Sequence, residues 1–216
     1  MDLKKYIRSI QDYPKKGILF RDITTLIKDS EAFNLTIDKI VEITKEIKFD
    51  KISAIESRGF IFASVVSYLV GKPLVLLRKK NKLPAERHSV DFQLEYGEAT
   101  IEVHKDSIAK DEKILVIDDL IATGGTALAG FNLVDQLGAR VHEFAAMVSL
   151  PFLDGVKKIH EHADGKFKDV PCFTMVDDST IGPEMGRDPP AGTPRVVAAG
   201  DAAKVLADIE AARASA

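Results

Sequence analysis

The sequence has little cysteine, no surplus of positive charge and no long apolar run, and each shortage excludes a class of protein. Its one cysteine, Cys172, rules out an internal disulfide framework and supplies too few thiolates for a cysteine-based zinc site. A net charge of −3 over 216 residues argues against a general nucleic-acid or membrane-surface binder, which needs a basic surplus. No apolar run approaches the length of a membrane span. We therefore expect a cytoplasmic protein with one well-cored domain, and neither nucleic acid nor membrane as a partner.

The stretch from Lys113 to Gly130 carries the clearest chemical pattern. The apolar run 114–117 predicts a strand buried on both faces, as in a parallel sheet, and Asp118 and Asp119 follow where that strand should end. A short loop of small and hydroxyl-bearing residues then leads into helical apolar spacing: Ala122, Thr123, Gly124, Gly125 and Thr126. A strand, a turn and a helix N-terminus together point several backbone N–H groups at one spot, which favours phosphate. The GxxxxGK[ST] and GxGxxG motifs are both absent, so the two best-known glycine-rich phosphate loops are excluded.

Two carboxylates beside a phosphate site need a partner other than phosphate. The hydroxyls of a ribose donate hydrogen bonds to carboxylates, so a sugar phosphate satisfies both halves of the pattern. The whole run from Lys113 to Thr126 closely resembles the 5-phosphoribosyl-1-pyrophosphate (PRPP) signature of the type I phosphoribosyltransferases. That resemblance implies that residues 122–126 bind the 5′-phosphate of PRPP and that Asp118 and Asp119 act on its ribose hydroxyls. It also implies Mg²⁺ carried by PRPP, without direct protein ligands but with contacts to the two acids through water.

A second strand, polar turn and helix of the same design lies upstream. Residues 51–55 predict the strand, residues 56–59 (ESRG) the turn, and residues 60–70 the helix. A lone arginine after a strand is usually a solvated surface charge, but the repeated design predicts a second anion site. The turn resembles the pyrophosphate-binding turn of the same family. This implies that Ser57 and Arg58 hold the diphosphate of PRPP and that Arg58 takes part in catalysis.

The segment from Gly17 to Thr24, GILFRDIT, is short and extended. Its residues alone favour an edge strand with a surface ion pair. Next to the phosphate pattern, however, it resembles the base-binding element of the adenine-specific members of the family. The resemblance implies that Leu19, Phe20 and Arg21 bind adenine, with the main chain near Leu19 and Arg21 reading the edge of the purine. Adenine presents an amino donor where guanine and hypoxanthine present a carbonyl, so a backbone donor and acceptor suffice to separate them.

A long polar stretch, residues 79–98, exceeds a simple connection and predicts a mobile lid loop. Its RKKNKLP and QLEYG segments resemble the lid of the adenine-specific enzymes. The resemblance implies that Lys82 approaches the diphosphate, and that Arg78 reaches across a homodimer interface to the diphosphate of the partner. Glu95 and Tyr96 are the implied catalytic residues of the lid. Glu95 would exchange a proton with the purine once closure excludes water.

Strands that alternate with helical runs predict βαβ units. We therefore expect a Rossmann-like, largely parallel α/β sheet flanked by helices, with a small hood and with ligands at the carboxyl ends of the strands. Apolar spacing from Leu3 to Ile10 predicts an N-terminal helix, and Ser30 is the expected cap of the next helix. The domain is expected to span residues 1–180. The tail, residues 181–216, is broken by several prolines and is either an artificial or read-through extension or a genuine helix that docks on a partner.

The resemblance as a whole implies a transferase of purine salvage. It would transfer the 5-phosphoribosyl group of PRPP to adenine, giving AMP and pyrophosphate, as a homodimer that uses Mg²⁺. Two alternatives stay open: a phosphoribosyltransferase for hypoxanthine, guanine or xanthine, or a non-catalytic regulator that senses PRPP. The presence of Arg58 and Glu95 counts against the regulator. Turnover on a panel of free bases separates the enzymes from one another.

Overall fold

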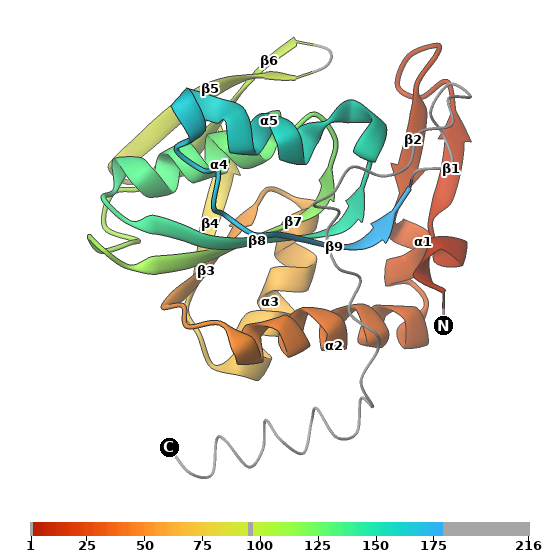
Figure 1. The fold of residues 1–216 in the computed structure, drawn as a ribbon, viewed down its shortest axis with the longest axis horizontal. Coiled ribbons are helices and arrows are strands. Elements are labelled where there is room, and N and C mark those ends of the chain that lie inside the picture. The colour runs from red at the N-terminus through yellow and green to blue at the C-terminus, as the bar shows by residue number, and fades with distance from the viewer. Residues whose placement is uncertain (1, 95–96, 179–216) are drawn as a thin grey trace.

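Seven strands form the main sheet of the protein, whose computed structural model describes residues 2–94 and 97–178. The strand order is β5-β6-β4-β3-β7-β8-β9 (Figure 1). Five adjacent strands run parallel: β4 (Leu74–Lys79), β3 (Lys51–Ile55), β7 (Lys113–Ile121), β8 (Arg140–Ser149) and β9 (Cys172–Asp177). The other two form a hairpin that joins β4 in the antiparallel sense: β5 (Arg87–Leu94) and β6 (Gly97–His104). The predicted α/β class and largely parallel sheet are confirmed.

Helices cover both faces of the sheet (Figure 1). One face carries α2 (Ser30–Glu46) and α3 (Arg58–Val70), and the other carries α4 (Gly125–Gln136) and α5 (Gly155–Glu161) with the short turns η2 (Pro151–Leu153) and η3 (His162–Gly165). Strand β7 is apolar on both sides because helices cover both sides of the sheet. Leu115 and Ile117 pack in the core between the sheet and helices α2 and α3. Ile114 and Val116 pack in the core of α4. None of the described helices has the length and apolar character of a membrane span.

The N-terminal residues form the hood, which we define as residues 3–22. It consists of η1 (Leu3–Tyr6) and an antiparallel ribbon of β1 (Arg8–Gln11) and β2 (Leu19–Asp22), and α1 (Thr24–Ile27) follows it. The predicted helix through Ile10 is therefore wrong. Asp2 does cap a turn by accepting from the Lys4 N–H at 3.1 Å, but the chain is extended from Ile7 onward. Pairing with β2, the next strand along the chain, satisfies the backbone groups that a helix would have satisfied within itself.

Two element boundaries differ from those expected. Asp29, rather than Ser30, caps α2, and its Oδ1 accepts from the Ala32 N–H at 2.9 Å. Aspartate and serine are both good N-caps, so adjacent candidates could not be ranked from the sequence. Strand β7 continues to Ile121, past Asp118 where it was expected to end, because its pairing with β8 continues that far. The acidic pair therefore lies inside a strand rather than after one.

Much of the stretch expected to be a lid loop is strand instead. From Arg87 to Leu94, every residue pairs with β6. The carboxylate of Glu102 holds the beginning of this stretch, since it accepts from the Asn81 N–H at 3.0 Å and lies 3.1 Å from the guanidinium of Arg87. Glu102 is only 2% exposed. The hairpin is thus fixed to the sheet through a buried charge, a contact between residues that no local pattern reveals.

Candidate functional site

Two strand–turn–helix corners meet at the carboxyl ends of β3 and β7, which are neighbours in the sheet. β3 leads through Ser57 into α3, and β7 leads through residues 122–124 into α4. Gly59 allows the close approach of the two corners, because a Cβ at this position would lie 2.8 Å from Ile117 O and 3.1 Å from Asp118 Cα. The first turn of α3 therefore rests on the backbone of β7. The two anion sites predicted from the sequence are brought together.

The phosphate corner, residues 122–126, is supported by a glycine that the sequence analysis missed. Gly124 caps α4 with φ at +82°, a left-handed conformation that suits glycine. A Cβ on Gly155, at the start of α5, would lie 2.2 Å from Ala122 O and 3.0 Å from Gly124 N. Thr123 is half-buried beside these groups. In the sequence, Gly155 is a single glycine before a short helix, and this signal is too common to interpret.

Asp118 and Asp119 are both buried, at 6% and 4% exposure. The Asp119 N–H donates to Asp118 Oδ1 at 2.8 Å. Burial raises the pKa of Asp118 well above its ordinary value, and the neighbouring charge of Asp119 raises it further. Burial also raises the pKa of Asp119, although the guanidinium of Arg58 counteracts part of that rise. A buried acidic pair of this kind is stabilised by hydroxyl donors or by a cation.

Arg58, the first residue of α3, connects the acidic pair to the hood. Its Nε lies 2.9 Å from Asp119 Oδ2. Its guanidinium also lies over the ring of Phe20, 5.5 Å from the ring centroid. Phe20 in turn makes an edge-to-face contact with Tyr13, with 5.1 Å between the ring centroids. The segments expected to bind ribose, diphosphate and base are therefore contiguous, and the Arg58 side chain, at 38% exposure, is accessible to a ligand.

The three residues of β2 that are expected to bind the base differ in their exposure. Leu19 and Phe20 are half-buried, whereas Arg21 is only 3% exposed. The Arg21 side chain turns into the protein, where Nη1 donates to Ser9 Oγ at 2.5 Å. A guanidinium held in this way is not available to a ligand. The geometry leaves the main chain of β2 and the ring of Phe20 for contact with a base.

Arg78, on β4, lies beside Glu56, in the turn between β3 and α3. Its Nε is 2.9 Å from Glu56 Oε2, and the same oxygen accepts from the Lys79 N–H at 2.7 Å. Burial would raise the pKa of Glu56, but the hydrogen bonds from Lys79 and Arg78 lower it. Glu56 is therefore held as a carboxylate that orients Arg78.

The other expected site residues are less constrained or lie outside the described ranges. Ser57 is exposed at the N-cap of α3, where its side chain makes no capping hydrogen bond and remains accessible. Lys82 is exposed between β4 and β5. Glu95 and Tyr96 lie outside the described residues.

A cavity of about 400 Å³ lies between β5 and α4, beside the phosphate corner. Thr123 and Gly125 line it on one side and Gln93 on another. The hairpin comes so close to the corner that a Cβ on Gly125 would lie 2.8 Å from Gln93 O. Asp91, Asn132, Lys158 and His162 also contribute polar side chains to the lining. The hairpin thus brings the chain next to residues 95–96 alongside the phosphate corner.

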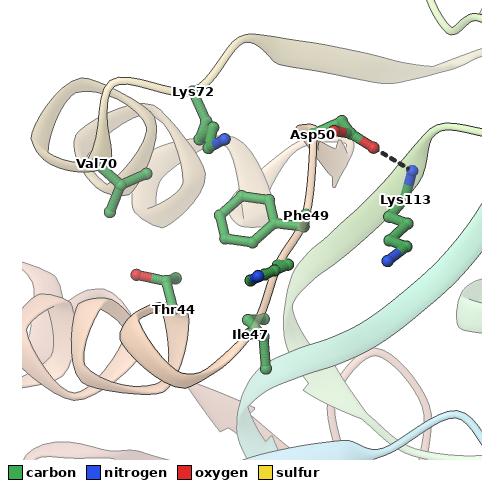
Figure 2. A pocket seen from close by; sticks show the side chains of 8 residues that line it. Thr44, Ile47, Phe49, Asp50, Val70, Lys72 and Lys113 are labelled. Carbon is green, nitrogen blue, oxygen red and sulfur yellow. Dashed lines mark hydrogen bonds between the residues drawn. The ribbon is translucent and has the colours of Figure 1, made fainter. Parts of the chain in front are cut away.

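A larger cavity, of about 520 Å³, lies at the opposite ends of the strands and contains none of the expected site residues (Figure 2). Figure 2 shows Phe49 between Lys72 and Lys113. The Lys72 ammonium lies 5.6 Å from the centroid of the Phe49 ring, and Asp50 accepts from the Lys113 N–H at 2.8 Å. Helices α2 and α3 both end here, and lysines stabilise the negative ends of helices. We therefore assign the functional site to the other end of the sheet.

Across residues 2–94 and 97–178, no three His, Cys, Asp or Glu side chains gather to hold a metal ion. The acidic pair of Asp118 and Asp119 nevertheless supplies carboxylate oxygens, which suit a hard cation such as Mg²⁺ that takes its remaining ligands from water and substrate. Cys172 is a free thiol, and burial, followed by the charge of Glu143, raises its pKa to about 12. The carboxylates of Asp118 and Asp119 therefore fit Mg²⁺ that arrives with a phosphorylated ligand.

Comparison with known proteins identifies relatives in sequence and in fold. Residues 25–186 match the phosphoribosyl transferase domain family. The adenine phosphoribosyltransferase of Pelagibacter ubique is 66% identical over 155 residues, which make up 72% of this chain and 89% of that protein. The crystal structure of the adenine phosphoribosyltransferase from Thermoanaerobacter pseudethanolicus has a TM-score of 0.75 at 40% identity and covers 81% of this chain and 97% of its own. A crystal structure of adenine phosphoribosyl transferase from Trypanosoma brucei, in complex with AMP, pyrophosphate and ribose-5-phosphate, has a TM-score of 0.76 at 29% identity. The match covers 91% of this chain and 87% of that protein.

Proposed function

The chain belongs to the phosphoribosyltransferase domain family and, within it, to the adenine phosphoribosyltransferases, and we propose that it transfers the 5-phosphoribosyl group of PRPP to adenine, giving AMP and pyrophosphate. The observation that carries this proposal is the meeting of two strand–turn–helix corners that the Arg58–Asp119 ion pair joins. One corner suits a monophosphate and the other a diphosphate, and the acids between them suit a ribose. The reaction makes the protein an enzyme of purine salvage.

In this proposal PRPP spans the two corners. The backbone N–H groups of residues 122–126 hold the 5′-phosphate, which the positive end of α4 attracts. The turn of Ser57 and Arg58 holds the diphosphate, because a planar guanidinium can donate to two phosphate oxygens at once. Asp118 and Asp119 accept hydrogen bonds from the ribose hydroxyls, directly or through water on Mg²⁺. PRPP is thereby held at its 5′-phosphate, at its diphosphate and at its ribose hydroxyls.

The ion pair between Arg58 and Asp119 gives a buried carboxylate a partner. A buried carboxylate without a partner is costly, and Arg58 stabilises Asp119 until substrate arrives. When PRPP binds, Arg58 turns to the diphosphate and the ribose hydroxyls take its place on Asp119. Bound Mg²⁺ would supply positive charge beside the leaving diphosphate, and Asp118 and Asp119 would hold it through water. Asp119 is therefore satisfied in both states.

The chemistry then needs little covalent help from the protein. The bond from ribose C1 to the diphosphate lengthens, positive charge develops on the sugar ring, and adenine N9 attacks. The chain stabilises the departing diphosphate and holds the base in line with C1. Arg58 serves both tasks, because it belongs to the diphosphate-binding turn and its guanidinium also lies over the ring of Phe20.

Adenine lies against the ring of Phe20 in this proposal. The inward direction of Arg21 supports this position, since it leaves the β2 main chain near Leu19 and Arg21 free to read the purine edge. A site built to accept from an amino group and to donate to a ring nitrogen leaves its own groups unpaired with a 6-oxo purine. Hypoxanthine and guanine should therefore be poor substrates.

Glu95 and Tyr96, which follow β5 in the sequence, would act on the base in this proposal, with Lys82 near the diphosphate. The support is the closeness of Gln93 to the phosphate corner. As N9 becomes nucleophilic, Glu95 exchanges a proton with the purine ring, and such positioned acid–base help is worth roughly 10²–10⁴-fold. Glu95→Gln should slow single-turnover AMP formation within that range, whereas Glu98→Gln in the same hairpin should not. A Glu95→Gln rate equal to that of wild type would remove Glu95 from the mechanism.

We also propose that the enzyme is a homodimer of the reducing cytoplasm. Ile61 on α3 and Leu76 on β4 expose apolar side chains, at 40% and 37%, and Tyr68 of α3 is 72% exposed. The occupant we assign to this surface is a second copy of the chain, because Arg78 lies on the same strand as Leu76 and the resemblance sends Arg78 to the diphosphate of a partner. The free thiol of Cys172 fits a reducing setting.

Turnover on a panel of free bases tests the proposed function. The purified protein is incubated with PRPP, Mg²⁺ and, in turn, adenine, hypoxanthine, guanine or xanthine, and the nucleotide products are separated by chromatography. We expect adenine to exceed every other base by about 10²-fold or more in kcat/KM. A preference for another base would mean that this base, and not adenine, is the substrate. Failure to form any nucleotide would reject the proposal.

A further inference from the structure

Asp178, directly after β9, ties the hood to the sheet. Its carboxylate forms an ion pair with Arg21 of β2 and lies 3.3 Å from the Lys4 ammonium. Arg21 and Asp178 are almost fully buried, at 3% and 5% exposure. The Asp178 N–H donates to Ser149 O at 2.9 Å, which fixes the residue to the end of β8. One carboxylate thus connects the sheet to the strand of the hood that carries Phe20.

Because β2 is a strand, the ion pair between Asp178 and Arg21 also sets the direction of the Phe20 side chain. Neighbouring residues of a strand point to opposite sides, so a strand that turns Arg21 into the protein turns Phe20 away from it. On that other side, the ring of Phe20 faces the guanidinium of Arg58 at 5.5 Å. Arg21 also donates to Ser9 of β1, so both strands of the ribbon are held by the same side chain.

We propose that Asp178 is a positioning residue for the purine base: acting through Arg21, it fixes the main chain of β2 and the ring of Phe20 relative to Arg58. The inference rests on the proposed function, because it assigns the base to the hood. Apolar residues of similar volume often stabilise a protein as well as a buried ion pair does. A planar guanidinium held by a fixed carboxylate and by Ser9 does more, because it also sets the direction of the strand.

Asp178→Asn tests the proposal, because it removes the charge of the anchor and keeps its shape. The KM for adenine should rise about 10-fold or more, since a displaced hood loses hydrogen bonds to the base. The Kd for PRPP, measured by calorimetry without base, should stay within about twofold of wild type. An ion pair that serves stability alone would lower Tm and leave the adenine KM unmoved, and that result would overturn the proposal. Equal losses for adenine and PRPP would overturn it too.

A second variant keeps the test decisive if Asp178→Asn fails to fold. Arg21→Met combined with Asp178→Leu removes both buried charges at similar volume. Circular dichroism checks the fold of this double variant, and we expect the same selective rise in adenine KM.

Lys51→Met is the control. It breaks a partly buried ion pair at the far end of the sheet, where the Lys51 ammonium lies 2.9 Å from the Glu112 carboxylate. It should lower Tm without changing the adenine KM. Wild-type protein that forms no AMP would reject the proposed function, whereas normal wild-type turnover with an unmoved adenine KM in the variants would reject only this inference.

Discussion

Arg58 contacts the acidic pair on one side and the hood on the other, so its removal tests the diphosphate corner. Arg58→Ala should lower kcat/KM for PRPP by about 10- to 10²-fold, because a charge-assisted hydrogen bond contributes roughly 1.5–3 kcal/mol. The KM for adenine should change less. Steady-state kinetics with each substrate varied in turn measures both. Arg140→Ala removes an arginine that is 73% exposed and serves as the control. Unchanged PRPP KM together with unchanged kcat in Arg58→Ala would contradict the diphosphate role.

Single residues were predictable where a motif fixes both their type and their spacing. Asp118, Asp119 and Arg58 are brought together as the two corners predict, because neighbouring parallel strands end at the same edge of the sheet. The direction of the Arg21 side chain could not be predicted. Its partner, Asp178, is far along the sequence, and no local pattern distinguishes a buried guanidinium from one that faces a ligand.

At the scale of elements, the start of α5 determines the shape of the phosphate corner. Gly155→Ala would place a methyl group 2.2 Å from Ala122 O, so the corner or the helix has to shift. Overpacking of this kind costs about 1–3 kcal/mol, and we expect PRPP to bind about 10-fold more weakly. Calorimetric titration with PRPP measures the change.

Gly130→Ala is the matched control for this prediction. It makes the same substitution inside α4, where the new methyl group meets only side-chain atoms of Leu77 and Ile55, at 3.1 Å and beyond. Alanine also has a higher helix propensity than glycine. PRPP affinity should stay at the wild-type level. If Gly155→Ala bound PRPP as tightly as this control, α5 would have no role in supporting the corner.

Elements with strong local periodicity were predicted, and those that depend on pairing with another strand were not. The buried strand at residues 114–117 and the helix after it follow from apolar spacing alone. The hood ribbon and strand β5 depend on partners that the local sequence does not specify. Residues 3–10 have helical apolar spacing, but β2 offers their backbone a better set of hydrogen bonds. Tertiary pairing overrides local preference at both places.

At the scale of the whole molecule, stability should depend on pH through Glu143 on β8. Burial, and then the nearby charge of Glu46, raise the pKa of Glu143 from 4.5 to about 7. Between these values the unfolded chain releases its proton while the folded chain keeps it. The free energy of unfolding therefore falls as the pH rises through this window, by about 3 kcal/mol over its full range.

Glu143→Gln isolates this effect. At pH 8 the variant should be more stable than wild type by up to about 3 kcal/mol, and at pH 5 the difference should be much smaller. Chemical denaturation at both pH values measures it, and Glu161→Gln, at an exposed position, is the control. A stability difference that is the same at pH 5 and pH 8 would show that Glu143 does not hold its proton in the folded protein.

The proposed dimer depends on the apolar surface of α3 and β4. Ile61→Glu would place a charge on that surface, and we expect it to convert the dimer to a monomer while the far-ultraviolet circular dichroism stays unchanged. Sedimentation equilibrium measures the mass. Lys157→Glu, on α5 in the opposite layer, should leave the dimer intact. A wild-type protein that sediments as a monomer at every concentration would reject the homodimer.

The architecture as a whole was predictable because alternating strands and helices permit few arrangements. The position of the hood beside the sheet, and of β5 at the edge of the sheet, was not predictable, since the buried charges of Asp178 and Glu102 contact residues distant in sequence there. The tail, residues 181–216, lies outside the described residues.

A crystal structure of the enzyme with PRPP and Mg²⁺, without base, tests the central claim most directly. The account predicts the 5′-phosphate within hydrogen-bonding distance of residues 122–126, the diphosphate at Ser57 and Arg58, and the ribose hydroxyls at Asp118 and Asp119. A 5′-phosphate bound elsewhere, for example in the lysine-lined cavity at the opposite end of the sheet, would contradict it.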